Sequence, residues 1–333
     1  MGFQNRNRHG LAGLFALLIG VLGIFGIAHA AYPEQKPIQL VVPYPAGGGS
    51  DVIARIVSAP LGQALAQTVI VENIGGATGL LGVKKVLGAA PDGYTVLQGS
   101  ANDIILTPLL NRAAGYKAED FKLVQPLSRS IVVLLVRNDL GVETIDQFVA
   151  LAKRSGANPL TYGSVGIGSQ YHLMGEKLAT KVGGHVLHAP YKGGAPVLQD
   201  LAGGQLDFAI LPYQTSMREM EKQGRLKIIA AFSKASEMPP TMSGIPSVEN
   251  SKTVPDFLYS VGSGYYVRKD VPDAVTEKIR SALWKVMENP GVRKALEDSG
   301  RAVMPRLSAA EARAFQDDET RRYNEMAQGF SLP

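Results

Sequence analysis

Short apolar runs alternate with longer amphipathic segments along most of this chain of 333 residues. Ile131–Val136 contains only β-branched and aliphatic residues, as a strand buried on both faces does. Thr144–Arg154 instead repeats its apolar residues with the spacing of a helix. Strands that alternate with helices predict an α/β fold with parallel or mixed sheets. The predicted strands occupy residues 38–44, 68–72, 94–98, 131–136, 160–163, 185–189, 206–211, 226–232 and 259–267.

One strand-to-helix junction is unusually rich in glycine. The strand 38–44 is followed by Pro45-Ala46-Gly47-Gly48-Gly49, and then by a helix that Ser50 or Asp51 is expected to cap. The unpaired N–H groups at the start of a helix, together with the helix dipole, attract anions. Glycines also let a ligand approach the backbone closely. An ordinary tight turn shows the same pattern, so this junction alone leaves both interpretations open.

A second junction of the same kind lies in the other half of the chain. The strand 160–163 runs into Ser164-Val165-Gly166-Ile167-Gly168, and Ser169 is the expected N-cap of the following helix. Two such junctions facing each other across a cleft would hold a carboxylate between backbone N–H groups and small hydroxyls. The pattern therefore predicts two α/β lobes that close on a ligand, as in hinge-bending binding proteins.

The first thirty residues predict a cleaved signal peptide. Arg6 and Arg8 precede an apolar run from Leu11 to Ile27, and Ala28-His29-Ala30 has the small–x–small pattern of a cleavage site. The run is shorter than the roughly 20 residues that span a bilayer, which argues against a membrane anchor. The chain has no cysteine, so a lipid-modified cysteine, disulfides and thiolate metal ligands are excluded. We expect an exported protein that is not lipid-anchored.

Length and charge narrow the class of protein. The length predicts about two domains, and 45% hydrophobic residues suffice for well-formed cores. A net charge of +5 and a pI of 9.2 raise the question of nucleic-acid binding. The Lys and Arg residues are scattered among Asp and Glu, however, with no basic stripe interleaved with aromatic residues. A solvated surface explains this charge better, and no nucleic-acid partner is expected.

The usual catalytic and metal-binding motifs are absent from the sequence. There is no GxxxxGK[ST], HExxH, GxSxG or GxGxxG pattern. His185 and His188 lie in one strand and face opposite sides, which is a poor arrangement for a metal. His172 has Glu176 four residues on, a possible ligand pair, but a role in orienting a binding loop is the simpler interpretation. We expect no metal and no organic cofactor, although an enzyme that uses Asp, Glu or His172 stays open.

Five groups of residues, in this order and spacing, carry a family resemblance through nearly all of the chain after residue 30. They are VPYPAGG at 42–48 with Ser50-Asp51 and Arg55, VEN at 71–73 with GA at 76–77 and Gly79, APDGY at 90–94, YGS at 162–164 with Gly166, GS at 168–169 and HL at 172–173, and PYKG at 190–193 with DL at 200–201 and Gly204. The chain resembles the Bug family of periplasmic solute receptors, the extracytoplasmic binding subunits of tripartite tricarboxylate transporters.

The resemblance implies a type II periplasmic-binding-protein fold, with two α/β lobes around a ligand cleft and two crossing strands. Domain 1 would be discontinuous and comprise residues 31–130 and 255–333, after a signal peptide at 1–30. Domain 2 would comprise residues 131–254. The implied function is that of a receptor for a small organic carboxylate, either a di- or tricarboxylate or an aromatic acid. Its implied partners are the membrane subunits of such a transporter, its location is the periplasm, and the family favours a monomer.

The resemblance also implies a binding site formed by the two junctions. The residues that it points to are Tyr44, Ala46, Gly48, Ser50 and Asp51 from one lobe, and Ser164, Gly166, Ser169, His172, Tyr191 and Gly193 from the other. Ser100 and Asn102, at the end of the strand 94–98, are expected to line the cleft as well. Asp51 is expected to fix its loop as a cap rather than contact an anionic ligand, since two anions repel.

The sequence departs from the family pattern after the strand 206–211. Relatives often place polar or acidic residues where this chain has Leu211-Pro212-Tyr213, so a ligand without an amine is favoured. Tyr44, Tyr191 and Tyr213 could flank an aromatic or extended acid. The returning strand also lacks the Trp that relatives often carry near the crossing. The alternative function is an exported α/β enzyme that acts on a carboxylated substrate.

Overall fold

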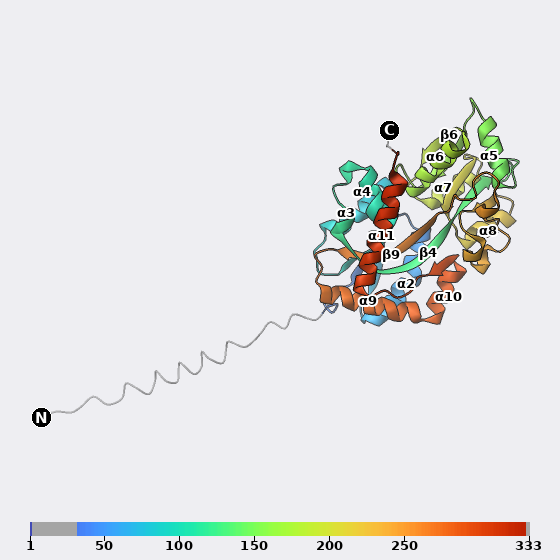
Figure 1. Ribbon diagram of the computed structural model, residues 1–333. Helices are drawn as coiled ribbons and strands as arrows, with labels where there is room; N and C mark the ends of the chain where they lie inside the picture. Colours follow the sequence, from blue (N-terminus) through green and yellow to red (C-terminus); the bar gives the residue numbers. More distant parts are fainter. Residues whose placement is uncertain (2–31, 331–333) are drawn as a thin grey trace.

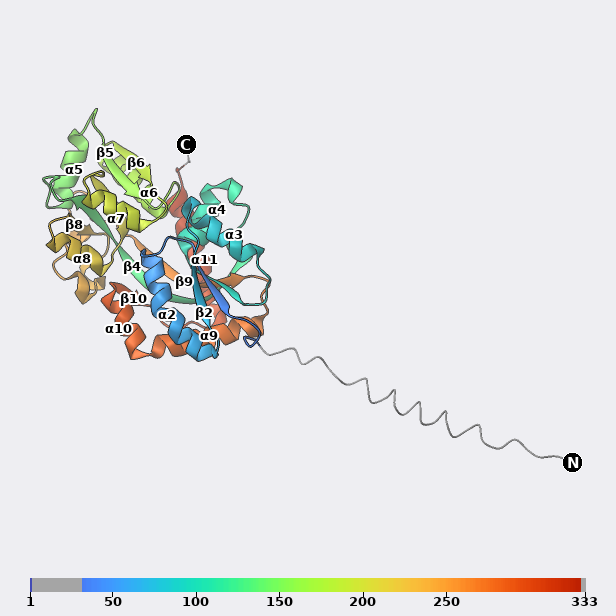
Figure 2. The same cartoon turned by 180° about the vertical axis from the view of Figure 1, so that it is seen from behind.

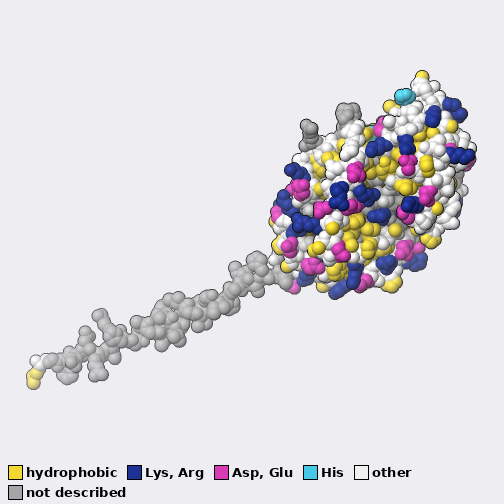
Figure 3. Space-filling view, viewed as in Figure 1, with side chains coloured by type: hydrophobic (Ala, Val, Ile, Leu, Met, Phe, Trp, Pro, Cys, Tyr) yellow, Lys and Arg dark blue, Asp and Glu magenta, His cyan; other side chains and the backbone are white. Residues whose placement is uncertain are grey.

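The computed structural model describes Met1 and residues 32–330, which form two α/β lobes joined side by side (Figure 1). The predicted signal peptide lies outside the described residues. No helix of the described part is both long and apolar enough to cross a bilayer. On the face drawn in Figure 3, basic and acidic side chains are interspersed rather than gathered into patches of one sign.

The strands form one continuous, curled sheet whose order is β2-β1-β3-β9-β4-β7-β5-β6, with β8 and β10 also paired to β4. Pairs β1–β2, β1–β3, β5–β6 and β5–β7 are parallel, whereas every pair that involves β4 or β9 is antiparallel. The strands are β1 (Ile38–Val42), β2 (Val69–Asn73), β3 (Thr95–Ser100), β4 (Phe121–Arg137), β5 (Leu160–Ser164), β6 (Val186–Pro190), β7 (Phe208–Pro212), β8 (Leu226–Ala231), β9 (Ser260–Arg268) and β10 (Arg301–Val303).

The long strand β4 belongs to both lobes. Its first part, Phe121–Ile131, pairs with β9 in the first lobe, and its last part pairs with β7 and β8 in the second. Ile131–Val136 is buried along its whole length, as its unbroken apolar sequence predicts. Each such aliphatic side chain contributes roughly 1.5–3 kcal/mol on burial. The boundary expected after residue 130 falls inside this strand, and the one after residue 254 falls in the loop before β9.

Helices cover both faces of the sheet of the first lobe. Helices α2, α9 and α10 pack on one face around Ile53, Leu61 and Leu283. Helices α3 and α11 pack on the other face, where Val83 and Tyr323 are buried. Figure 2 shows α2 and α9 along the lower lobe, with α3 and α4 beside its upper edge. The helices of this lobe are α2 (Gly49–Leu65), α3 (Leu80–Gly88), α4 (Thr107–Leu110), α9 (Asp273–Glu288), α10 (Pro290–Asp298) and α11 (Ala309–Ala327).

The second lobe has its own core, built on β4, β5, β7 and β8. The rings of Tyr162 and Phe208 stack within it with centroids 5.0 Å apart, and Phe148 meets Phe208 edge to face. Its helices are α5 (Ile145–Arg154), α6 (Gln170–Val182), α7 (Gly194–Ala202) and α8 (Thr215–Lys222).

The predicted helix caps are confirmed at one junction and wrong at the other. Ser169 caps α6, since its side chain accepts a hydrogen bond from the N–H of His172. Helix α2, by contrast, begins at Gly49 with Gly48 as its N-cap, and neither Ser50 nor Asp51 caps it. The Asp51 carboxylate instead accepts a hydrogen bond from the Gly47 N–H, which precedes the helix. The first N–H groups of α2 consequently lack a side-chain cap.

Candidate functional site

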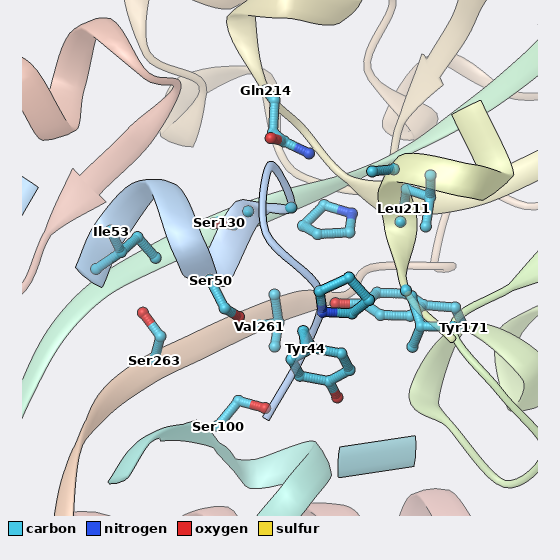
Figure 4. Close-up of a pocket in the computed structure, with 18 of the residues that line it drawn as sticks. Tyr44, Ser50, Ile53, Ser100, Ser130, Tyr171, Leu211, Gln214, Val261 and Ser263 are labelled. Carbon is cyan, nitrogen blue, oxygen red and sulfur yellow. The ribbon is translucent and has the colours of Figure 1, made fainter. Parts of the chain in front are cut away.

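A cavity of about 70 Å³ lies between the two lobes, where the β1–α2 loop meets the second lobe (Figure 4). Tyr44, Gly48, Ser50, Ser100 and Gly193 line it, so the structure brings together five of the residues that the sequence suggested. In Figure 4, Gln214 and Ser100 lie at opposite ends of the group, with Ser50 and Val261 between them.

The floor of this cavity is one face of the strands that join the lobes. Antiparallel register places Ser130 of β4 between Val261 of β9 and Arg301 of β10. Residue Ser263, two positions on from Val261, is on the same face and is paired with Ser100 of β3. From Arg301 on β10 to Ser100 on β3, the floor crosses three spacings between neighbouring strands, or about 14 Å. Arg301 and Ser100 therefore mark opposite ends of the floor.

The β1–α2 loop forms the wall from the first lobe. Gly48, Gly49 and Ser50 line the cavity at the uncapped N-terminus of α2. Asp51 itself does not line it, and its carboxylate bonds to Gly47 N and Arg55 Nε, both at 2.9 Å. Although burial acts in the opposite direction, these hydrogen bonds hold the pKa of Asp51 below its usual value. Asp51 thus holds the loop in shape.

A second uncapped helix reaches the same loop from the other lobe. Gly193 is the N-cap of α7, again without a side-chain cap, and Gly193, Gly194 and Ala195 line the cavity. A Cβ on Gly193 would lie only 2.8 Å from Cδ of Pro45. The two helix N-termini therefore converge around the Pro45–Ser50 loop, which makes this end of the cavity favourable for an anion.

The opposite end of the cavity is supported by a buried carboxylate. Asp103, in the π-helical turn Asn102–Leu106, accepts hydrogen bonds from the Tyr44 hydroxyl at 2.5 Å and from both N and Oγ of Ser100 at 2.8 and 2.9 Å. The amide of Asn102 donates to the Tyr44 hydroxyl at 2.8 Å. Burial raises the pKa of Asp103 despite these donors. Asn102 lies behind the cavity wall and, through Oδ1, accepts from the Gln170 N–H of the other lobe.

The expected site residues of the β5–α6 loop form a buried network instead of facing this cavity. Ser164 Oγ contacts Ser169 Oγ and lies 2.7 Å from Nε2 of His188. The ring of His172 stacks on that of His188 at 3.9 Å, and its Nδ1 accepts from the Gly168 N–H. Burial lowers the pKa of His172 to about 4 and, with His172 as neighbour, that of His188 to about 3. The neighbouring side chain of Val165 reaches the cavity.

The remaining expected residues do not line this cavity. Ala46 is exposed on the loop, and the hydroxyl of Tyr191 donates to Asp200 at 2.6 Å. Tyr191 and Gly166 line a separate cavity of about 370 Å³ between the lobes. Tyr213 is fully buried, and its hydroxyl donates to the Thr241 carbonyl at 2.7 Å.

Several lining residues were not anticipated from the sequence. Ser130, Val261 and Ser263 belong to the joining strands, where a period of two along each strand could have indicated them. Gln214 lies beside Gly49 from the second lobe. Arg301 is only 1% exposed, and it alone carries a formal charge among the described residues that line the cavity. No local signal distinguishes it, since it follows Gly300 in a three-residue strand.

Two α/β lobes that share joining strands and enclose a cavity between them define a bilobal solute-binding protein. The chain belongs to the tripartite tricarboxylate transporter family of receptors, whose family model matches residues 53–332. The resemblance to the Bug family and the expected periplasmic-binding fold are thereby confirmed.

Individual relatives agree with this assignment. A UPF0065 protein from the TAR-I ttuE–ttuC′ intergenic region of Agrobacterium vitis is 32% identical over 265 residues, which cover 80% of this chain and 75% of the relative. The structure of the periplasmic binding protein BugD has a TM-score of 0.79 and 28% identity, with 89% of this chain and 98% of that chain covered. MatC from Rhodopseudomonas palustris, solved with bound malate, has the same fold with a TM-score of 0.81 at 24% identity, covering 89% of this chain and all of MatC.

Proposed function

We propose that this protein is a monomeric periplasmic receptor that binds a small organic carboxylate and delivers it to the membrane subunits of a tripartite tricarboxylate transporter. The observation that carries the proposal is the convergence of two uncapped helix N-termini, those of α2 and α7, on one cavity between the lobes. Each helix presents unpaired backbone N–H groups and the positive end of its dipole to the end of the cavity beside the Pro45–Ser50 loop.

Membership of the receptor family and the malate bound by MatC both support a carboxylate ligand. The enzyme alternative is less well supported by the site. Among the described residues, Ser164 and His188 form the one hydrogen-bonded pair of a serine hydroxyl and a histidine ring, and Ser164 is fully buried away from the cavity. We found no cluster of three or more His, Cys, Asp or Glu residues that could hold a metal in the described part of the chain.

The test is ligand binding by refolded, ligand-free protein that begins at residue 31. Thermal unfolding is measured with formate, butyrate, hexanoate, succinate, malate, adipate, citrate, benzoate and nicotinate, and with amino acids as a contrast. A ligand that binds only the native state raises the melting temperature by mass action. We expect a shift with one class of carboxylate, calorimetric stoichiometry of one, and recovery of the acid unchanged. Chemical conversion of the acid would support the enzyme alternative, and a flat response across all carboxylates would contradict the proposal.

A further inference from the structure

Arg301 is a buried cation that lines the cavity, and no described residue provides it with a counter-ion. It forms no ion pair with any described acidic residue, and its exposed fraction is 1%. The acidic groups beside the site have other partners, because Oδ2 of Asp51 pairs with Arg55, and Asp103 accepts from Tyr44 and Ser100. A buried charge without a partner is costly, and burial lowers the pKa of this guanidinium to about 10. An anion in the cavity would remove that cost.

The hydrogen bonds of Arg301 leave two donors unused. Nη1 donates to the backbone oxygen and to Oγ of Ser299, at 2.9 and 2.8 Å. Nη2 donates to the carbonyl of Gly49, the first residue of α2, at 3.0 Å. Nε is buried and has no partner. A guanidinium carries five N–H groups, so Nε and one N–H of Nη2 have no acceptor among the described residues. Two N–H groups are the number that a carboxylate accepts in a bidentate pair.

The far end of the cavity has the opposite character. The hydroxyl hydrogens of Ser100 and Tyr44 are both donated to Asp103, and the Tyr44 oxygen also accepts from Nδ2 of Asn102, so neither hydroxyl has a hydrogen left to donate to a ligand. The buried Asp103 carboxyl lies directly behind them. A carboxylate at this end would meet acceptors and a second carboxyl, whereas a methyl group or a hydroxyl donor would not be repelled.

The wall from the second lobe is largely apolar. Val165, Tyr171 and Leu211 line it, and none of them carries a formal charge. The cavity is also small, with a volume of about 70 Å³. A ligand that fills this space is small, with an anionic group near Arg301 and an apolar or hydroxylated body.

We propose that Arg301 binds the ligand carboxylate directly as a bidentate guanidinium pair, and that the cavity selects small monocarboxylates because its Ser100 end excludes a second carboxylate. The inference rests on the proposed function and specifies the ligand class of the same site. Arg301 is then a binding residue, and its bonds to Ser299 and Gly49 orient it toward the N-terminus of α2.

The experiment measures dissociation constants by calorimetry for three matched pairs of acids: butyrate and succinate, hexanoate and adipate, and benzoate and terephthalate. Butyramide, hexanamide and benzamide serve as uncharged counterparts. For the wild type, we expect every monocarboxylate that binds to have an affinity about tenfold higher, or more, than that of the matched dicarboxylate. We also expect it to bind more tightly than its amide.

Arg301→Met tests the residue itself, and Arg306→Met is the matched control, because Arg306 is an exposed arginine paired with Glu288 outside the cavity. We expect Arg301→Met to weaken carboxylate binding by about 10- to 100-fold. Amide binding should change little, so the ratio of carboxylate to amide affinity falls. Arg301→Lys keeps the charge without the bidentate edge, and it should give an intermediate ratio. A merely structural role would weaken acid and amide alike.

The proposal would be overturned if Arg301→Met left the ratio of carboxylate to amide affinity unchanged. If the Met variant does not fold, wild-type affinity for acids in Arg301→Lys would overturn it. Tighter binding of the dicarboxylates by the wild type would also overturn it. If no carboxylate binds to the wild type at all, the proposed function itself fails, which is a distinct result.

Discussion

Asn102 of the first lobe accepts a hydrogen bond from the backbone N–H of Gln170 in the second lobe, with a distance of 2.8 Å between Oδ1 and N. The same side chain donates from Nδ2 to the hydroxyl of Tyr44, behind the cavity wall. One buried amide therefore connects the closed arrangement of the two lobes to the cavity. A second contact across the lobes, from Oγ1 of Thr78 to the carbonyl of Ile167 at 2.9 Å, lies near the cavity of Tyr191 and Gly166.

Asn102→Ala should weaken ligand binding without loss of the fold. The substitution leaves the Gln170 N–H of the first turn of α6 unsatisfied only when the lobes close, at a cost of about 1–3 kcal/mol. We expect an affinity lower by about tenfold and a larger radius of gyration for the liganded protein by small-angle X-ray scattering. Asn324→Ala is the control, since Asn324 bonds only within α11 on the surface. Wild-type affinity in Asn102→Ala would show that the contact does not contribute to closure.

Gly193→Ala should hinder the approach of the lobes by sterics alone. The backbone at Gly193 is extended, with φ of 171°, so an alanine there is not strained, but its Cβ would lie 2.8 Å from Pro45 of the other lobe. Overpacking of this kind costs about 1–3 kcal/mol. We therefore expect an affinity reduced by about tenfold with the melting temperature of the ligand-free protein nearly unchanged. Gly88→Ala, where an added Cβ meets nothing within 4 Å, is the comparison.

Asp51→Asn should loosen the β1–α2 loop and remove a pH-dependent contribution to stability. The pKa of Asp51 is lowered in the folded protein, so its stabilising effect is present above its ordinary value of 3.8 and is lost as the pH falls below it. We expect a lower melting temperature and weaker ligand binding at pH 7, and a smaller loss of stability on acidification below pH 3.8 than in the wild type. Asp298→Asn, on the surface of α10, controls for the change of charge. Equal acid sensitivity of wild type and Asp51→Asn would contradict this role.

The stacked histidines His172 and His188 should make the second lobe sensitive to mild acid. Both pKa values are lowered from 6.5, to about 4 and about 3, so the folded protein keeps the rings neutral while the unfolded chain takes up protons below pH 6.5. Stability is then lost as the pH falls from 6.5 toward 4. His188→Gln keeps a hydrogen-bonding group beside Ser164 but does not titrate, and urea unfolding from pH 7 to pH 4 should show a flatter dependence. The same slope in both proteins would refute the assignment.

The alternation of strands and helices was sufficient to predict the two α/β lobes, because each element carries its own periodicity. The cap at Ser169 was predictable for the same reason, since a serine three residues before His172 acts within one helical turn. At the first junction the local rule failed, because the Asp51 side chain turns back to Gly47 and leaves Gly48 as the cap. The sequence offers several side-chain oxygens that could cap the helix, and it does not indicate which backbone N–H group each of them bonds.

The site was predictable only where the loop backbone itself forms it. Gly48, Ser50 and Gly193 line the cavity because they lie at the starts of helices. Ser164 and His172 were also expected to line the cleft, but they lie in the buried network of the β5–α6 loop and do not line this cavity. Arg301 could not be foreseen, because it reaches the cavity through the pairing of β10 with β4, a contact between residues 171 positions apart at Ser130. Such pairing depends on the assembled sheet and not on any nearby residue.

The sharing of β4 between the lobes also sets an order in which the chain can fold. The strands of the second lobe, β4 to β8, are contiguous in sequence, so their sheet can form as soon as residue 231 is available. The first lobe needs β9 to join β3 to β4, and β9 begins only at Ser260. A chain that lacks its last quarter consequently has β1, β2 and β3 but not β9, the strand that joins them to β4. During synthesis, the cavity between the lobes is thus completed late, because its floor requires Arg301 of β10, and only helix α11 follows that strand.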